Sequence, residues 1–177
     1  REGFGVAREE RACALLAELL EQRLAEVVAP GARGPGDTRF DLGHVASLPP
    51  LIDMGVLEGP LQVDCVMGVT GGAPATPESL EFMSRQIPDA RGGRNNWGVI
   101  GISREQWRLG AAALALGGNF RVGLEDNFYL PDGEMARSNG ELIAKARDMV
   151  HAAGRRVASV EEAREMLGSP KLVARGP

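Results

Sequence analysis

The sequence has few aromatic residues and few reactive side chains. Of its 177 residues, 5% are aromatic, two are histidines and two are cysteines. The hydrophobic share of 44% is still that of a globular domain, so we expect an aliphatic core rather than a disordered chain. Cys13 and Cys65 lie far apart and follow no metal-binding or redox spacing. We therefore interpret them as buried free thiols in a reducing compartment.

Long basic runs and long apolar runs are also missing. The 24 acidic residues outnumber the 20 basic ones, which gives a net charge of −4 and argues against nucleic acid or an anionic membrane as a partner. The apolar stretch over residues 109–118 is about half the length of a membrane span. The charged opening segment predicts no secretory signal. We expect a cytoplasmic protein without a membrane or nucleic-acid partner.

Glycine, in contrast, is abundant. Its 24 residues are about twice the usual share and follow no collagen-like period, so they belong in turns and loops. Apolar residues at helical spacing predict a helix over residues 8–28, which ends at a Gly/Pro-rich segment, residues 30–37. We therefore divide the chain into an N-terminal helix with its linker, residues 1–38, and an α/β domain, residues 39–177.

The α/β domain alternates between predicted strands and helices. Strands are expected over residues 39–42, 61–69, 97–102 and 120–124, and helices over residues 44–57, 76–87, 103–116, 138–153 and 159–167. Pro49 and Pro50 interrupt the first of these helices near its start. Thr76 is a predicted N-cap, and Ser103 and Ser159 each open a predicted capping box. The strand starts lie 22, 36 and 23 residues apart, close to one βα unit each, which predicts a parallel sheet. Two architectures fit this pattern, a doubly wound sheet and half of a (β/α)8 barrel.

The densest group of polar residues is the segment RVGLEDN, residues 121–127. Strand alternation points Arg121 and Glu125 to one face and the apolar residues between them to the other, and Asp126 follows the strand. Charges on a buried strand are stable only when they are paired. Active sites of parallel α/β proteins lie at the carboxyl ends of strands. Two interpretations stay open: a structural ion pair, or a catalytic or metal-binding group.

A glycine-rich segment, MGVTGGAPAT, follows the second predicted strand. Gly71 and Gly72 would let the backbone approach a ligand next to a helix N-terminus, although the lysine of a P-loop is missing. They are candidate substrate-binding positions, and a tight turn into a capped helix is the alternative. Within the same predicted strand, Asp64 could join a polar network inside a barrel.

Both histidines are weak candidates for a site. His44 follows Asp41 at a predicted strand end, and it could serve as a general base, a metal ligand or a local cap. His151 lies near the end of a predicted helix, where the helix dipole favours it, so we expect no further role. Trp97 and Trp107 are expected to be packing residues.

Several longer blocks carry further information. They are FDLGH, LIDMGVLEGPLQV, MGVTGGAPATPESL, WGVIGISREQ, AAALALGGNFRVGLEDN and GRRVASVEEAREMLG, in consistent order over most of the chain. Together they resemble the beta-keto acid cleavage enzymes, a family that includes 3-keto-5-aminohexanoate cleavage enzyme. The resemblance implies the C-terminal half of a (β/α)8 TIM barrel, with about four parallel strands and with zinc at its mouth. It also implies that a 3-oxo acid and acetyl-CoA are the substrates, that acetoacetate and a new acyl-CoA are the products, and that the protein is a homo-oligomer.

The resemblance implies roles for three residues. Glu125 corresponds to the zinc-binding glutamate of the family, and Arg121 and Asp126 to its catalytic Arg–Asp dyad, which takes the proton that starts the reaction. Zinc would act as a Lewis acid on the 3-keto oxygen, and Asp126 would be the base, held in place by Arg121.

Three departures from the family pattern limit this expectation. The H-x-H segment that supplies two zinc ligands does not occur in the sequence, and a catalytic zinc generally needs three protein ligands. Thr38 stands where the family has a glutamate, and Glu105 where it commonly has a histidine. We therefore expect a half-barrel that other polypeptide completes. The alternatives are an inactive truncated relative that folds by self-association, and an independent doubly wound domain that binds an anion.

Overall fold

The computed structural model describes residues 36–57, 61–88 and 96–166. The predicted helix over residues 8–28 and Cys13 lie outside these ranges, so the division of the chain at residue 38 stays a prediction. The described elements, in chain order, are β1 (Gly36–Arg39), α2 (Leu42–Ala46), α3 (Leu48–Asp53), β2 (Gln62–Met67), α4 (Pro77–Arg85), β3 (Asn96–Gly101), α5 (Glu105–Ala115), β4 (Asn119–Arg121), α6 (Asn139–Ala152) and α7 (Val160–Met166).

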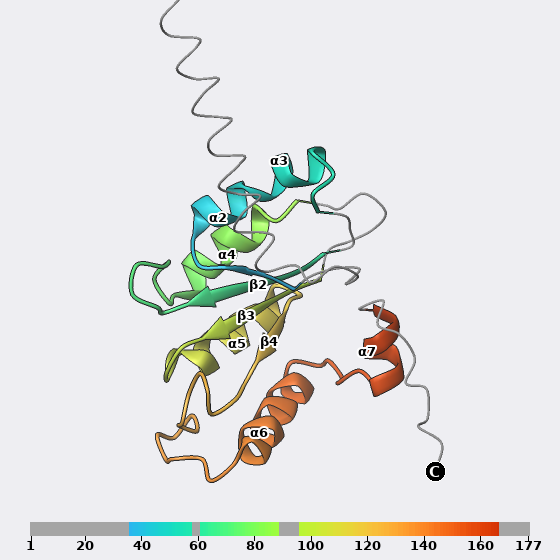
Figure 1. The fold of residues 1–177 in the computed structure, drawn as a ribbon. Coiled ribbons are helices and arrows are strands. Elements are labelled where there is room, and N and C mark those ends of the chain that lie inside the picture. The colour runs from blue at the N-terminus through green and yellow to red at the C-terminus, as the bar shows by residue number, and fades with distance from the viewer. Residues whose placement is uncertain (1–35, 58–60, 89–95, 167–177) are drawn as a thin grey trace, which may run out of the picture.

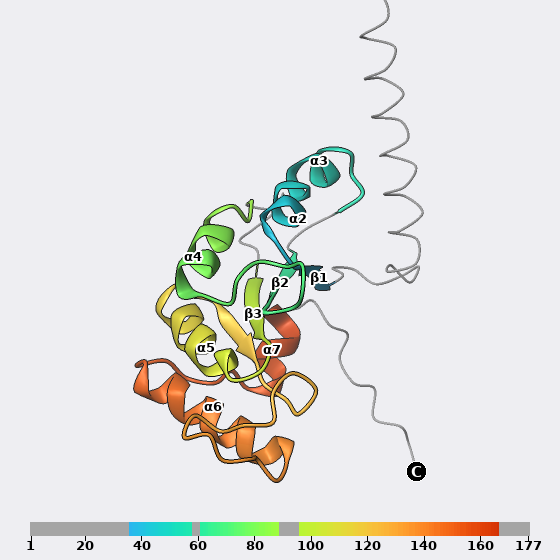
Figure 2. The same ribbon diagram turned by 90° about the vertical axis from the view of Figure 1, so that its left-hand side faces the viewer.

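The four strands form one parallel sheet in the order β1-β2-β3-β4. Helices α4, α5 and α6 follow one another along one side of the sheet (Figures 1 and 2). This consecutive order is that of part of a (β/α)8 barrel, whereas the strand order of a doubly wound sheet reverses at a switch point. The predicted α/β class with four parallel strands is therefore confirmed.

The main core lies between the helices and one face of the sheet. Val63, Cys65 and Met67 of β2 and Val99 of β3 are buried there, and leucines from the surrounding helices complete the cluster. Cys65 is a free thiol, as predicted. Burial, with a smaller contribution from the charge of Asp64, raises the pKa of this thiol to about 12, so it stays protonated.

The opposite face of the sheet carries the alternate residues of each strand. The pairing register places Val66, Ile100 and Arg121 in one row across β2, β3 and β4. The next row toward the amino ends of the strands holds Asp64, Gly98 and Asn119. We call this surface the inner face, because strands of a barrel turn the corresponding residues toward its interior.

The first two βα units depart from the sequence prediction. β1 ends at Arg39, where a strand over residues 39–42 was predicted, because the side chain of Asp41 caps α2 and turns the chain directly into it. The helix predicted over residues 44–57 is interrupted near its start, as predicted: it consists of two helices that meet at Ser47, with Pro49 and Pro50 in the first turn of the second. β4 is also shorter than predicted, since it ends at Arg121.

Most predicted helix caps are confirmed. The side chain of Thr76 caps α4. Ser159 and Glu162 form the predicted reciprocal capping box before α7. The capping box predicted at Ser103 is wrong: Ser103 has a left-handed φ of 62°, and its carbonyl oxygen, not its side chain, accepts a hydrogen bond from the backbone N–H of Gln106.

No helix in the described part of the chain has both the length and the apolar character that crossing a bilayer requires.

Candidate active site at the carboxyl end of the fourth strand

The loop after β4 begins where the strand alternation was predicted to continue. The side chains of Val122 and Leu124 pack against a small cluster formed by α5, α6 and the segment before α6, as the apolar pattern predicted. The chain then turns, and the backbone N–H groups of Asp126 and Asn127 both donate to the carbonyl oxygen of Gly123, at 3.1 and 3.0 Å. Glu125 therefore lies in a turn rather than on the strand.

Arg121 and Asp126 form a bidentate ion pair across this turn. Nε of Arg121 donates to Oδ2 of Asp126 at 3.0 Å, and Nη2 donates to Oδ1 at 2.8 Å. Planar fork-to-fork geometry of this kind is among the strongest arrangements of paired charges. Asp126 is 8% exposed, whereas the side chain of Arg121 is half exposed. Hydrogen bonding to Asp126 raises the pKa of Arg121 above its usual value.

Glu125 is the third charged residue of the loop. Its Oε2 lies 3.6 Å from Nη2 of Arg121, and 84% of its side chain is exposed. The structure therefore brings together the three residues that the sequence singled out, Arg121, Glu125 and Asp126. The two carboxylates differ in how tightly they are held. Both oxygens of Asp126 accept short hydrogen bonds, whereas the carboxylate of Glu125 makes a single longer contact.

Neighbouring elements fix the loop through contacts that sequence reasoning missed. The backbone N–H of Ser103 donates to the carbonyl oxygen of Asp126 at 2.7 Å, and the side chain of Asn139 in α6 accepts from the backbone N–H of Leu124 at 2.8 Å. A cavity of about 310 Å³ lies between the loop and the first turns of α6. No local pattern in the sequence indicates either bond, because each joins residues that lie far apart in the chain.

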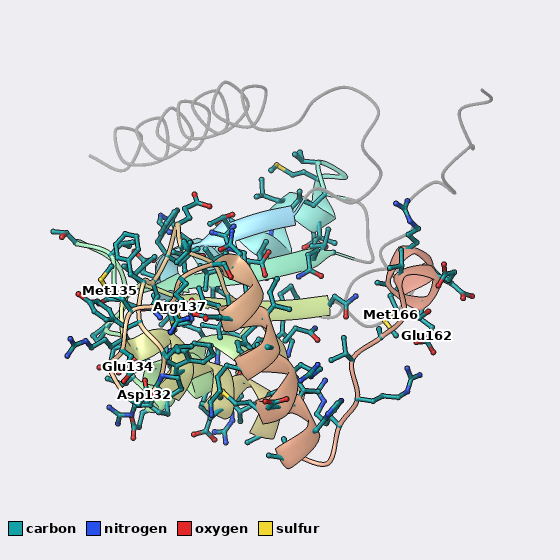
Figure 3. The ribbon with its side chains drawn as sticks, turned by 90° about the horizontal axis from the view of Figure 1, so that it is seen from below. Asp132, Glu134, Met135, Arg137, Glu162 and Met166 are labelled. Carbon is teal, nitrogen blue, oxygen red and sulfur yellow. The ribbon has the colours of Figure 1, made fainter. Side chains whose placement is uncertain are left out.

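The segment between β4 and α6 is also held by hydrogen bonds to the backbone of Tyr129. Asn127 is buried, and its side chain both donates to and accepts from the backbone of Tyr129, at 2.6 and 3.1 Å. The indole N–H of Trp107 donates to the carbonyl oxygen of Tyr129 at 2.7 Å, so Trp107 is more than the predicted packing residue. Figure 3 shows the exposed part of this segment, with Glu134 and Met135, on one side of the molecule and α7 on the other.

The glycine-rich loop after β2 is packed against the end of β1. A Cβ atom on Gly72 would lie 2.8 Å from the carbonyl oxygen of Phe40, and the backbone N–H of Ala73 donates to that oxygen at 2.7 Å. Gly71 has a left-handed φ of 85°. Close packing thus accounts for the glycine at position 72, and the substrate-binding role of Gly71 and Gly72 stays a prediction.

His44 makes local contacts in the same region. Its Nδ1 accepts a hydrogen bond from the backbone N–H of Phe40 at 3.3 Å, and its own backbone N–H donates to Oδ1 of Asp41 at 3.0 Å. Of the three roles considered for His44, general base, metal ligand and local cap, these contacts fit the local cap. His151 occupies the last turn of α6, as expected.

The described residues do not form a complete zinc site. Within residues 36–57, 61–88 and 96–166, no group of three or more histidine, cysteine, aspartate and glutamate side chains is placed to hold a metal ion. Glu125 is available as one ligand, whereas a catalytic zinc generally has three protein ligands. The donor set of the described residues therefore does not fit zinc by itself.

Consecutive parallel βα units, with paired charges after the last strand, are the arrangement of a barrel-type α/β protein whose polar site lies at the strand ends. A family comparison identifies the group within this class. The family model of the beta-keto acid cleavage enzymes matches residues 22–168. The chain belongs to the beta-keto acid cleavage enzyme family, as the sequence blocks indicated.

Individual relatives agree with the family match. The chain is 39% identical over 132 residues to a 3-keto-5-aminohexanoate cleavage enzyme of Acetoanaerobium sticklandii, covering 75% of this chain and 47% of the relative. It is 36% identical over 132 residues to the enzyme of the same name from Fusobacterium nucleatum, covering 75% and 46%. It is 33% identical over 159 residues to a 3-oxoadipate:acetyl-CoA acetyltransferase of Cupriavidus necator, covering 88% and 54%. The chain thus spans about half the length of these relatives.

Proposed function

We propose that the chain supplies the Arg121–Asp126 dyad of an enzyme that converts a 3-oxo acid and acetyl-CoA into acetoacetate and a new acyl-CoA. In this proposal the described sheet is one half of a (β/α)8 barrel, and other polypeptide provides the remaining strands. The observation that carries the proposal is the bidentate pair at the carboxyl end of β4. Membership in the beta-keto acid cleavage enzyme family supports the reaction class.

Asp126 is the base in the proposed reaction. Each of its carboxylate oxygens accepts one hydrogen bond from Arg121, and a carboxylate oxygen can accept more than one. The remaining acceptor capacity can take the proton from the carbon between the keto and carboxylate groups of the 3-oxo acid. The C–H bond breaks, and its electron pair delocalises onto the 3-keto oxygen. Arg121 fixes the orientation of the base and balances its charge.

Glu125 is proposed as a zinc ligand, with two histidines outside this chain completing the set. Its exposed side chain, with one 3.6 Å contact to Arg121, can turn toward a cation without breaking a short hydrogen bond. A zinc ion held there would polarise the 3-keto oxygen of the substrate. Because the described residues contribute a single ligand, the proton transfer above is assigned to Asp126 and Arg121 alone.

The experiment begins with the DNA upstream of the codon for Arg1. We expect an in-frame segment that encodes an H-x-H motif. The longer polypeptide is then expressed and assayed for acetoacetate formation from acetyl-CoA and a panel of 3-oxo acids. Asp126→Asn should reduce turnover by about 100-fold or more while leaving the zinc content unchanged. Glu125→Gln should reduce the zinc content measured by elemental analysis.

Glu134→Gln is the matched control, because Glu134 is an exposed glutamate between β4 and α6. It should change neither zinc content nor turnover. Near-normal activity of Asp126→Asn would overturn the dyad assignment. A folded longer polypeptide with no turnover on any 3-oxo acid would favour the inactive-relative alternative.

The 177-residue chain alone gives a second test. It should retain no stoichiometric zinc after purification, since its sequence contains no H-x-H segment. One tightly bound zinc per chain would contradict the proposed ligand set and would make His44 a candidate zinc ligand. We also expect self-association, measured by light scattering, because β1 and β4 each have one unpaired edge in the described sheet.

A further inference from the structure

Asp64 is a charged residue in the middle of β2, on the inner face. Its neighbours along the strand, Val63 and Cys65, are fully buried in the core on the other side. Oδ1 of Asp64 accepts a hydrogen bond from Nε2 of Gln62 at 3.3 Å. Burial raises the pKa of Asp64, and both this hydrogen bond and the charge of Arg121 oppose that shift. A carboxylate is costly in such a place unless a positive charge compensates it.

Gly98 makes room for this carboxylate. It pairs with Asp64 across β2 and β3, and a Cβ atom at position 98 would lie 2.9 Å from Oδ1 of Asp64. Gly98 does not have a positive φ, so the backbone conformation does not require glycine here. The space that the missing side chain leaves is therefore the reason for glycine at this position.

Arg121 lies on the same face, one row nearer to the carboxyl ends of the strands. The register aligns Arg121 with Ile100, two residues after Gly98. Its Nε and Nη2 are directed to Asp126, and attraction to Asp64 and Glu125 adds to the raised pKa of Arg121. The guanidinium group thus pairs with Asp126 beyond the strand end, and Asp64 lies on the same face in the next row, two strands away on β2.

We propose that Asp64 is a positioning residue for the Arg121–Asp126 dyad and that Gly98 is the residue that permits it. The carboxylate of Asp64 attracts the guanidinium group from across the inner face and keeps it over that face, in line with Asp126. This attraction favours the short bonds of Arg121 to Asp126 over a closer approach to Glu125, whose contact with Arg121 stays at 3.6 Å. The consequence for turnover rests on the proposed function, whereas the effect on Arg121 does not.

The first test measures Arg121 directly by nuclear magnetic resonance of the 15N-labelled 177-residue chain. In Asp64→Asn and in Gly98→Ala, hydrogen exchange at Nε of Arg121 should be about threefold faster than in the unmodified chain. The matched control is Asp148→Asn, which removes an exposed carboxylate that pairs with its neighbour Arg147 on α6. It should leave this exchange rate unchanged. Unchanged exchange in both test variants would overturn the proposal.

The second test needs no substitution. In the unmodified chain, the Nε signal of Arg121 should shift with pH, and one step of this shift should coincide with the titration of the carboxyl carbon of Asp64 and be separate from the step due to Asp126. If the Arg121 signal does not follow the titration of Asp64, the proposal is wrong, whether or not the variants fold.

Activity of the longer polypeptide separates this proposal from the proposed function. Asp64→Asn should lower kcat with little change in KM, and Asp64→Glu should restore part of it. If the unmodified enzyme is inactive but Arg121 still responds to Asp64, the proposed function fails and the positioning role stands. If the enzyme is active and Asp64→Asn has the same kcat, the positioning role fails and the proposed function stands.

Discussion

Two regions at the carboxyl edge of the sheet use their polar groups in opposite ways. After β1 and β2, the polar groups bond to neighbouring backbone and close the turns. These groups are the side chains of Asp41 and His44 and the backbone N–H of Ala73. After β4, Arg121 and Asp126 bond to each other through side chains, while backbone groups from Ser103 and Gly123 hold the loop. The comparison shows that a polar residue at a strand end is a site candidate when local backbone contacts do not occupy its side chain.

Asp126→Ala should produce the largest loss of stability. The substitution leaves Arg121 without its bidentate partner next to a buried position, and we expect a loss of about 2 kcal/mol in the free energy of unfolding. Urea denaturation followed by circular dichroism measures it. An unchanged midpoint would show that the pair contributes nothing to stability and would weaken the contrast between the two regions.

Gly72→Ala tests whether the first region is fixed by packing. The new methyl group would meet the carbonyl oxygen of Phe40 at 2.8 Å, so we expect a destabilisation of about 1–2 kcal/mol by the same measurement. Gly140→Ala is the control, because its methyl group would meet only Oγ of Ser138 at 3.4 Å on α6. That substitution should stabilise the chain slightly. Equal effects of the two substitutions would contradict the packing explanation.

His44→Ala should have a smaller effect. It removes an exposed hydrogen bond to the N–H of Phe40 and an edge contact between the two rings, worth about 0.5–1 kcal/mol together. Turnover of the longer polypeptide should be unchanged. A large loss of turnover with intact folding would make His44 a functional residue and would remove the distinction between the regions.

Glu125→Gln should have the smallest effect on stability. Its side chain is exposed and makes one contact of 3.6 Å, so we expect a change below about 0.5 kcal/mol. A destabilisation as large as that of Asp126→Ala, measured in the same urea series, would show that Glu125 is a structural residue of the loop rather than a free ligand.

The sequence predicted the βα order because that order depends on local patterns, whereas the roles of Arg121 and Asp126 were implied by the family resemblance. Alternating apolar residues located β2 and β3, and the grouping of charges located Arg121 and Asp126. The bonds from Ser103 and Asn139 could not be predicted, since they join elements far apart in the chain. The start of β1 was misplaced because Gly36 and Asp37 are poor strand formers, and pairing with β2 overrides their preference.

The position of Ser103 joins two successive βα units mechanically. Its backbone is held in a conformation that is unusual for a residue with a side chain, and its N–H is attached to the peptide that carries the proposed base. A displacement of the chain after β3 would therefore reach Asp126 through this one hydrogen bond. The third βα unit and the proposed base in the fourth are in this way linked by a single backbone contact.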